Sequence, residues 1–411
     1  MTNLLWPGDQ RAGELMTDQA LLRSMVAVES AWLGALAAAG LAPADCAGAE
    51  VGHLVSGRDC EPLAVIAEDG GNPVIGLVDL LRRRALPAFA PWIHRGLTSQ
   101  DVLDTGLMLA VRAVVDQVIS QLAEQISTLS ALASEHRATP MVARTLTQHA
   151  APTTFGAKAA GWLNGAVDAY QRLSALSTPV QLGGAAGTRS ATVELAMLLT
   201  GAHDAAEIAD EVVRRVATTL GLDVRPPWHT TRTPVTSAAD ALVGCTDCWG
   251  RIASDVVTLV RPEIAELSES GDAQRGGSSS MPHKRNPVLS ILIRRAAIAA
   301  PQLGATLHTA AALANDERPD GAWHAEWDTL RTLARRTVVA GSQCAELLAG
   351  LRVDAARMAE NLAATDVLGE QHAIADLVGK EPSATYFGAV DRLIDESLDR
   401  ARRALRDRSV S

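Results

Sequence analysis

The stretch that decides the fold is residues 276–287, GGSSSMPHKRNP. A flexible linker is also rich in Gly and Ser, but it does not continue into a basic, proline-bounded segment of this kind. The glycines let backbone N–H groups approach a ligand closely, and Lys284 and Arg285 add positive charge. Asn286 and Pro287 predict a helix N-cap and first turn, so the loop is expected to end on a helix N-terminus, which attracts anions. The alternative is an ordinary surface loop followed by a capped helix.

The composition is typical of a helical globular enzyme. Of 411 residues, 47% are hydrophobic, 20% are charged and only 3% are aromatic. Abundant Ala and Leu favour helices over sheets, and the length allows two or three domains. The net charge of −10 makes nucleic acid an unfavourable partner. An anionic substrate therefore requires a locally positive site.

The N-terminus and the cysteines exclude further classes of protein. The first residues lack a basic start followed by an apolar segment, so no signal peptide is expected. No apolar run reaches the roughly 18 residues that span a membrane, and a cytoplasmic protein without a membrane segment is predicted. Five cysteines do not suggest a disulfide framework. The pair Cys245 and Cys248 is interpreted as helix packing rather than as a metal or redox site.

Apolar residues recur at three- and four-residue steps over long stretches, which predicts helices. These stretches run from Asp101 through Leu122, from Ala191 to about Leu220, from Thr236 to about Leu267, and from Pro287 past Leu313. No sustained alternation demands a sheet. Breaks are expected near Pro87–Pro91, Gly183–Gly187, Pro226–Pro227 and Ser268–Ser280. Helices that are apolar over much of their circumference must be buried, so association with other chains is expected.

A second cluster, residues 94–101, is HRGLTSQD. Thr98 and Asp101 have the spacing of a capping box directly before an apolar-periodic helix, so the pattern alone indicates a helix start. A helix N-terminus that carries the two hydroxyls of Thr98 and Ser99 is also suited to a carboxylate. The two interpretations are compatible.

Three further clusters contain candidate site residues. They are residues 144–156, RTLTQHAAPTTFG; residues 227–232, PWHTTR; and residues 317–327, ERPDGAWHAEW. A lone histidine is more often structural or exposed than catalytic. The tryptophans of the last cluster are as easily core anchors with a partner for the N–H as substrate contacts.

Together these motifs resemble one superfamily. Residues 276–287 resemble the GSSxMPxKxNP signature of the fumarase/aspartase superfamily, and residues 94–101 resemble its HxGxTSxD segment, in which Thr and Ser bind a substrate carboxylate. The resemblance implies an all-α fold: an N-terminal helical domain over 1–95, a central long-helix bundle domain with the signature loop over 96–338, and a short C-terminal helical domain over 339–411. It also implies a homotetramer with a twenty-helix core and active sites shared between chains.

The chain departs from the lyases of this superfamily at four positions. The acid/base His of the third cluster is Leu146 here, and its Glu partner, seven residues after Lys284, is Ile291. Because a buried acid without its partner is costly, the loss of both together is coherent. The Ser and Arg with which adenylosuccinate lyases hold a nucleotide phosphate are Trp323 and Trp327, and uncharged rings do not replace a phosphate clamp.

The clusters at 227–232 and 317–327 instead resemble the bacterial 3-carboxy-cis,cis-muconate cycloisomerases. This resemblance implies lactone formation from a small polycarboxylate in protocatechuate breakdown (the β-ketoadipate pathway), without metal or organic cofactor. Ser278 takes the base position of the superfamily, and His149 is the alternative acid. The implied substrate-binding residues are Thr98, Ser99, Gln148, His229, Arg232, Lys284, Asn286 and Arg318.

Two other functions stay open on the sequence. One is a lyase of the same superfamily that eliminates fumarate from a succinyl-type substrate. Leu146 keeps this alternative open, because the cycloisomerases carry an aromatic residue there, and so does the short C-terminal domain. The other is an inactive helical scaffold, against which Ser278, Lys284 and Asn286 argue.

Overall fold

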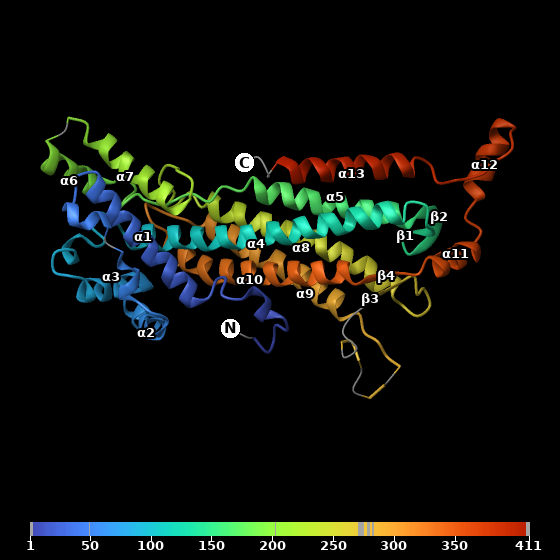
Figure 1. Cartoon of the computed structure of the whole chain (residues 1–411), viewed down its shortest axis with the longest axis horizontal. Coiled ribbons are helices and arrows are strands. Elements are labelled where there is room, and N and C mark those ends of the chain that lie inside the picture. Colours follow the sequence, from blue (N-terminus) through green and yellow to red (C-terminus); the bar gives the residue numbers. More distant parts are fainter. Residues whose placement is uncertain are drawn as a thin grey trace. The chain divides into compact units, whose positions relative to one another are not determined.

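Helices dominate the structure, a computed structural model that describes residues 3–48, 50–201, 203–269, 275–277, 280–281 and 283–407. They make up 67% of the chain. The strands of the described part form two antiparallel two-stranded sheets (Figure 1). The mostly helical fold is confirmed, whereas the homotetramer and its twenty-helix core remain predictions.

The described residues contain four long helices, of which the first three correspond to stretches predicted from the apolar periodicity. They are α4 (Ser99–Glu135), α8 (Thr233–Leu259), α9 (Val288–Ala312) and α10 (Ala322–Ala349). On α4, the periodic residues Val111, Val114, Val118 and Leu122 are completely buried, as the spacing predicts. The first predicted helix is therefore confirmed and continues to Glu135.

The chain divides into two compact units, each built from three separate stretches. Unit 1 consists of Met1–Asp116, Leu176–Asp240 and Gln302–Arg335, and unit 2 consists of Gln117–Ala175, Ala241–Pro301 and Arg336–Ser411. Four of the five boundaries fall inside the four long helices, and the fifth lies between residues 175 and 176. The three consecutive domains predicted over 1–95, 96–338 and 339–411 follow the sequence order instead and remain a prediction.

Besides its parts of the long helices, unit 1 contains five shorter α-helices and several 3-10 turns. The α-helices are α1 (Asp18–Ala38), α2 (Cys60–Gly70), α3 (Pro73–Arg84), α6 (Ser190–Thr200) and α7 (Ala205–Leu220). The 3-10 turns are η1 (Asp9–Ala12), η2 (Ala44–Gly48), η3 (Val51–Leu54), η4 (Gly57–Asp59) and η5 (Ala90–Trp92). Gly201 adopts a φ of 61° after α6, so the helix predicted from Ala191 to about Leu220 is two helices.

Among its described residues, unit 2 contains four shorter helices and both two-stranded sheets. The helices are α5 (Phe155–Ser174), α11 (Ala355–Ala363), α12 (Gly369–Val378) and α13 (Val390–Asp407). The strands are β1 (Pro140–Thr145), β2 (Gln148–Thr154), β3 (Leu267–Glu269) and β4 (Leu351–Val353). Helix α13 packs on α5, where Ile394 lies among Ala159 and Ala160.

Two features differ from the sequence prediction. Helix α8 ends at Leu259 rather than near Leu267, because the following turn places Ala265 at a φ of 53° and Leu267 then enters β3. The hairpin of β1 and β2 was not predicted either. Its two-residue turn is Leu146-Thr147, which lacks the Asn-Gly type of signal that marks such turns.

Two helices of the described part, α1 and α9, are long and apolar enough to cross a membrane by length and composition alone. Core helices of soluble proteins pass the same test. In α1, Trp32, Leu33 and Leu36 are at most 2% exposed, as expected for a core helix.

Candidate active site

The start of α4 brings two predicted binding residues together with a cation. Asp101 accepts a hydrogen bond from the Thr98 backbone N–H at 3.0 Å, which is one half of the predicted capping box. The Thr98 hydroxyl accepts from the Arg318 guanidinium at 2.5 Å, and Arg318 also donates to the Ala185 carbonyl at 3.2 Å. Because both partners are neutral, the charge of exposed Arg318 is left for an anion, beside the helix start that carries Ser99.

Asp101 organises the backbone around this helix start. Its side chain is fully buried, and its two oxygens accept from the backbone N–H groups of Gly183 and Gly184, both at 2.9 Å. The Gln181 amide at 3.2 Å and the His229 Nε2 at 3.1 Å also contact it. His229, predicted to bind substrate, thus supports the carboxylate that holds the helix start and the Gly183–Gly184 turn.

The predicted binding residue Arg232 lies in a buried ion cluster. Its guanidinium contacts Asp104 at 2.7 Å and Glu326 at 2.5 Å, and its side chain has no exposed area. Burial alone would lower the pKa of Arg232, but the two carboxylates hold that pKa above its ordinary value. Burial raises the pKa of Glu326. Since its charge is already matched, Arg232 is better suited to holding α4, α8 and α10 in place than to binding an anion.

The two tryptophans of residues 317–327 pack against each other. The rings of Trp323 and Trp327 are edge to face with centroids 4.7 Å apart. The Trp323 N–H donates to Asp104 at 2.9 Å, and its ring is 3% exposed. Trp323 is therefore a core anchor with a satisfied N–H, one of the two roles considered for it.

In unit 2, the hairpin of β1 and β2 carries Gln148 and His149. Both side chains are exposed, and the His149 Nδ1 lies 2.7 Å from the Thr365 hydroxyl. The turn residues Leu146 and Thr147 adopt φ values of 48° and 73°, a left-handed backbone that favours glycine or asparagine. Leu146 is 96% exposed and Ile291 is 48% exposed, so neither replacement of the lyase His–Glu pair is buried within the single chain.

The signature loop is closed by one glycine and one asparagine. The Asn286 backbone N–H donates to the Gly276 carbonyl at 2.8 Å, and its side-chain amide donates to the same oxygen at 3.2 Å. Gly276 has a φ of 77°, and a Cβ there would lie 2.4 Å from the Asn286 carbonyl oxygen, so this position requires glycine. Lys284 is exposed and makes no ion pair with the described residues. Ser278, the predicted base, lies outside the described residues.

The anion site expected at the helix after the signature loop is already filled. Helix α9 begins at Val288, and Pro287 rather than Asn286 accepts the first helical bond, from Ile291. Glu269 accepts from the backbone N–H groups of Leu289 at 3.1 Å and Ser290 at 2.9 Å, and from the Ser290 hydroxyl at 2.6 Å. The protein's own carboxylate thus satisfies the helix end that was expected to attract an external anion.

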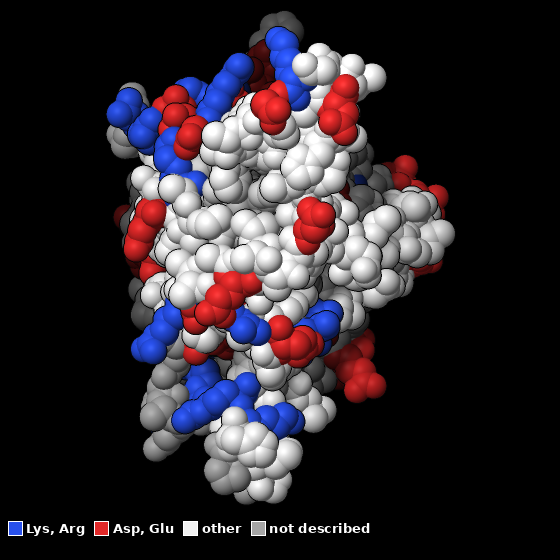
Figure 2. All heavy atoms as spheres, turned by 90° about the vertical axis from the view of Figure 1, so that its right-hand side faces the viewer, with Lys and Arg blue, Asp and Glu red and all other residues white. Residues whose placement is uncertain are grey.

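On the face shown in Figure 2, acidic and basic side chains lie near one another in several groups. Among the predicted site residues, Lys284 and Arg318 are exposed cations. The described residues contain no group of three or more His, Cys, Asp or Glu that could hold a metal ion. Cys245 and Cys248 are free thiols, and burial raises the pKa of both.

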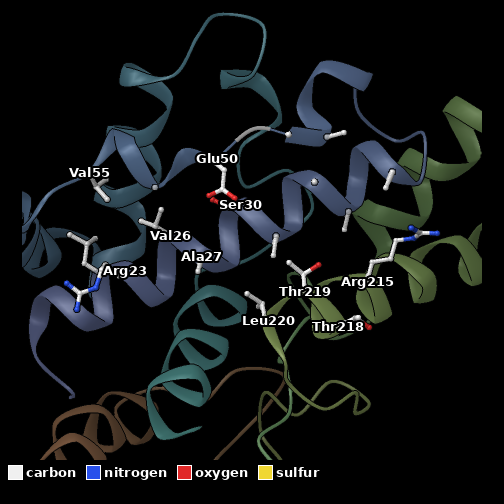
Figure 3. A pocket seen from close by; sticks show the side chains of 18 of the residues that line it. Arg23, Val26, Ala27, Ser30, Glu50, Val55, Arg215, Thr218, Thr219 and Leu220 are labelled. Carbon is white, nitrogen blue, oxygen red and sulfur yellow. The ribbon is translucent and has the colours of Figure 1, made fainter. Parts of the chain in front are cut away.

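A cavity of about 1030 Å³ lies elsewhere in unit 1, between α1, the segment 47–57 and the end of α7 (Figure 3). None of the predicted site residues lines it. Its Arg214 pairs with Glu207 at 2.6 Å and with Glu211 at 3.0 Å, and its Arg215 pairs with Glu211 at 2.9 Å, so both cations already have carboxylate partners. The cavity does not match the polycarboxylate site that the motifs predict.

Several residues that organise the candidate site were not predicted as site residues. Asp104 and Glu326 balance Arg232, Glu269 caps α9, and Thr365 contacts His149. Asp101 and Asp104 could have been recognised from the sequence as residues with buried partners, because two acids at a three-residue spacing inside an apolar helical pattern require such partners. Thr365 gave no signal, since its contact spans 216 residues.

The fold and these motifs define a lyase-type enzyme. Residues 20–301 match the family model described as "Lyase", and the chain belongs to this family, which is the fumarase/aspartase superfamily.

The chain is similar over most of its length to several individual proteins of known name. The nitrosuccinate lyase of Streptomyces davaonensis is 44% identical over 363 residues, which cover 87% of this chain and 75% of the relative. The 3-carboxy-cis,cis-muconate cycloisomerase of Bradyrhizobium diazoefficiens is 40% identical over 387 residues, covering 91% and 83%. The crystal structure of the 3-carboxy-cis,cis-muconate lactonizing enzyme from Pseudomonas putida matches with a TM-score of 0.84 and 30% identity, covering 96% of this chain and 97% of that chain.

Proposed function

We propose that the protein is a cycloisomerase that converts 3-carboxy-cis,cis-muconate to a carboxymuconolactone. The observation that carries the polycarboxylate substrate is the contrast between two arginines, and the cycloisomerase reaction is chosen for the likeness to the Bradyrhizobium and Pseudomonas putida enzymes. Arg318 donates to the neutral Thr98 hydroxyl and keeps its charge for a carboxylate, whereas Arg232 is neutralised by Asp104 and Glu326. Together with Trp323 packed in the core, this favours a small polycarboxylate without phosphate.

The reaction needs only acid/base chemistry and charge stabilisation. One carboxylate oxygen bonds to a carbon of the conjugated diene, and the electron pair of that double bond moves onto a neighbouring carboxylate, giving an enediolate. A proton, ultimately from solvent, then adds to the α-carbon and regenerates the carboxylate. Positioned donors typically make the largest contribution to stabilising such an anion, and Arg318, Ser99 and Lys284 are suited to this. His149 or Ser278 would deliver the proton.

The proposal includes assembly of active sites from several chains of a homotetramer. Helix α9 supports it, because Ile291 and Ile298, seven residues apart on one face, are 48% and 72% exposed in the single chain. An exposed apolar helix stripe of this kind is typical of an interface. We also propose a cytoplasmic location and a role in protocatechuate breakdown.

Complementation tests the shared site. Ser278→Ala and His149→Gln should each abolish or strongly lower turnover while leaving the helical content intact. Co-refolding of the two variants should restore part of the activity, because some mixed tetramers would contain intact sites. Verified mixed tetramers without activity would contradict active sites shared between chains.

A second candidate is a lyase that acts on nitrosuccinate, favoured by the 44% identity to the Streptomyces enzyme. Here a base removes a proton from the carbon next to the C–N bond, nitrite leaves, and the new double bond gives fumarate. The same carboxylate-binding residues serve both reactions, so geometry alone favours neither.

Direct assays separate the two functions. Purified protein with a chelator is given 3-carboxy-cis,cis-muconate, nitrosuccinate or adenylosuccinate in parallel. Loss of the diene absorbance without nitrite or fumarate release is expected, with no cleavage of adenylosuccinate. Nitrite and fumarate release from nitrosuccinate, with no reaction of the muconate, would overturn the cycloisomerase and establish the second candidate.

A further inference from the structure

Glu266 connects several distant segments of unit 2. Its fully buried carboxylate forms a two-point ion pair with Arg144, at 2.7 and 3.0 Å, and accepts from the Asn361 amide at 2.8 Å. Its backbone N–H donates to the Leu259 carbonyl at 2.9 Å, and its carbonyl accepts from Asp354 at 3.0 Å. One residue thus binds β1, α11, the end of α8 and the residue that caps α11.

Two of these contacts lead to His149. Arg144 is the direct cross-strand partner of His149 in the hairpin of β1 and β2. Asn361 lies on α11, four residues before Thr365, whose hydroxyl is 2.7 Å from the His149 Nδ1. Glu266 therefore holds both segments that contact the histidine, from the strand side and from the helix side.

Glu266 is also connected to the signature loop, through Glu269. Three residues after Glu266, Glu269 caps α9 through Leu289 and Ser290. Strand β3 joins the two glutamates and pairs with β4, with Leu267 opposite Val353. Helix α9 begins at Val288, directly after the last residue of the signature loop, so the C-terminal end of that loop, here called its base, is fixed to the same structural element.

The local backbone shows that this position is held by tertiary contacts. Ala265, directly before Glu266, has a φ of 53°, a conformation that costs free energy for a residue with a side chain. A buried ion pair is also a poor source of net stability, since apolar residues of equal volume often replace it without loss. The fixed geometry that the Arg144–Glu266 pair imposes on its surroundings explains better than net stability why a buried ion pair is present at this position.

We propose that Glu266, acting through Arg144, is a positioning residue that fixes the His149 hairpin relative to the base of the signature loop. The proposal rests on the proposed function for the catalytic roles of His149 and that loop. It assigns no contact with substrate to Glu266.

The test uses Glu266→Gln, Arg144→Gln and Arg144→Lys in the full-length protein. The matched control is Arg137→Gln, which removes the ion pairs of another Arg of unit 2, with Asp391 at 3.2 Å and with Asp395. Amide hydrogen exchange should accelerate at least about tenfold in peptides covering Met141–Thr154 and the base of the signature loop in both Gln variants, while exchange in α5 stays unchanged. The control should leave these peptides as in the wild type.

Kinetics supply the second measurement. Misplacement of a catalytic group by about 1 Å costs about 100-fold in rate, so kcat should fall about 10- to 100-fold in Glu266→Gln and Arg144→Gln, with KM changed much less. Arg144→Lys, which keeps one charge, should recover part of kcat. If Glu266→Gln does not fold, the two Arg144 variants decide the outcome.

Two results would overturn the proposal. One is amide hydrogen exchange that rises equally throughout unit 2, which would indicate a merely structural role. The other is a wild-type kcat in a variant whose hairpin shows accelerated exchange. If the wild-type protein acts on neither candidate substrate, the proposed function fails. The exchange measurement then still decides whether Glu266 positions the two segments.

Discussion

Replacement of Asp101 by Asn tests the central support of the candidate site in unit 1. The carboxylate oxygens accept five hydrogen bonds, from Thr98, Gln181, Gly183, Gly184 and His229. The substitution changes the shape of the side chain very little, but it turns one acceptor oxygen into an NH₂ donor. In either orientation of the amide, at least two buried or partly buried donors lose their acceptor.

The expected loss of stability follows from these contacts. Each buried donor without a partner costs about 1–3 kcal/mol, so Asp101→Asn should lower the free energy of unfolding by about 2–6 kcal/mol. Urea unfolding at fixed protein concentration measures it, because the proposed assembly would make stability concentration-dependent. The variant should also raise KM, since the Thr98 turn loses its anchor.

Asp204→Asn is the matched control. Asp204 is an exposed N-cap that accepts one hydrogen bond, from the Glu207 N–H at 3.1 Å, and Asn caps about as well as Asp. Its change should stay below about 0.5 kcal/mol. A loss below about 1 kcal/mol for Asp101→Asn would refute the view that this carboxylate organises the turn.

Gly183→Ala should lower both stability and activity, because a Cβ would lie 2.7 Å from the His229 ring; normal thermal unfolding and kinetics would contradict this steric argument. Arg318→Gln should raise KM for a carboxylate substrate about tenfold or more with little change in unfolding, and an unchanged KM would remove it from the binding site. Hydrogen bonds from Arg84 lower the pKa of Asp59 to about 2, so the stability it contributes is fully present above about pH 4 and is lost as the pH falls towards 2. Thermal unfolding across this range should show a smaller acid dependence in Asp59→Asn, and equal dependence would disprove the linkage.

Much of the helical framework was predictable from the sequence. The apolar spacing after Asp101 corresponds to α4, and Thr98 stands directly before its first residue, because both depend on local periodicity and capping. The split at Gly201 was missed because the apolar spacing continues on both sides of it. The hairpin at Leu146-Thr147 was missed because tertiary contacts impose its left-handed turn against local preference.

The motifs named candidate site residues but not their arrangement. Thr98 and Arg318 were named from separate clusters, and the structure adds that Arg318, 220 residues away, donates to the Thr98 hydroxyl. They gave no sign that Arg232 is neutralised by buried acids or that Glu269 fills the end of α9. Such pairings depend on long-range packing, which the residue types alone do not specify.

The turn at Leu146-Thr147 has a consequence for the order in which the chain folds. A hairpin with a favourable turn forms early and locally, within microseconds. The left-handed backbone of Leu146 and Thr147 is unfavourable for these residue types, so this turn does not stabilise the hairpin by itself. The hairpin is instead expected to form only after the Arg144–Glu266 ion pair, whose residues are 122 positions apart in the chain. Closing such a long loop costs conformational entropy, which slows the formation of this contact. We expect pulse-labelled hydrogen exchange during refolding to show protection of Met141–Thr154 after that of α4; early protection of the hairpin would contradict this order. Substitution of Leu146-Thr147 by Asn-Gly should then bring its protection forward, by making the turn independent of the rest of the chain.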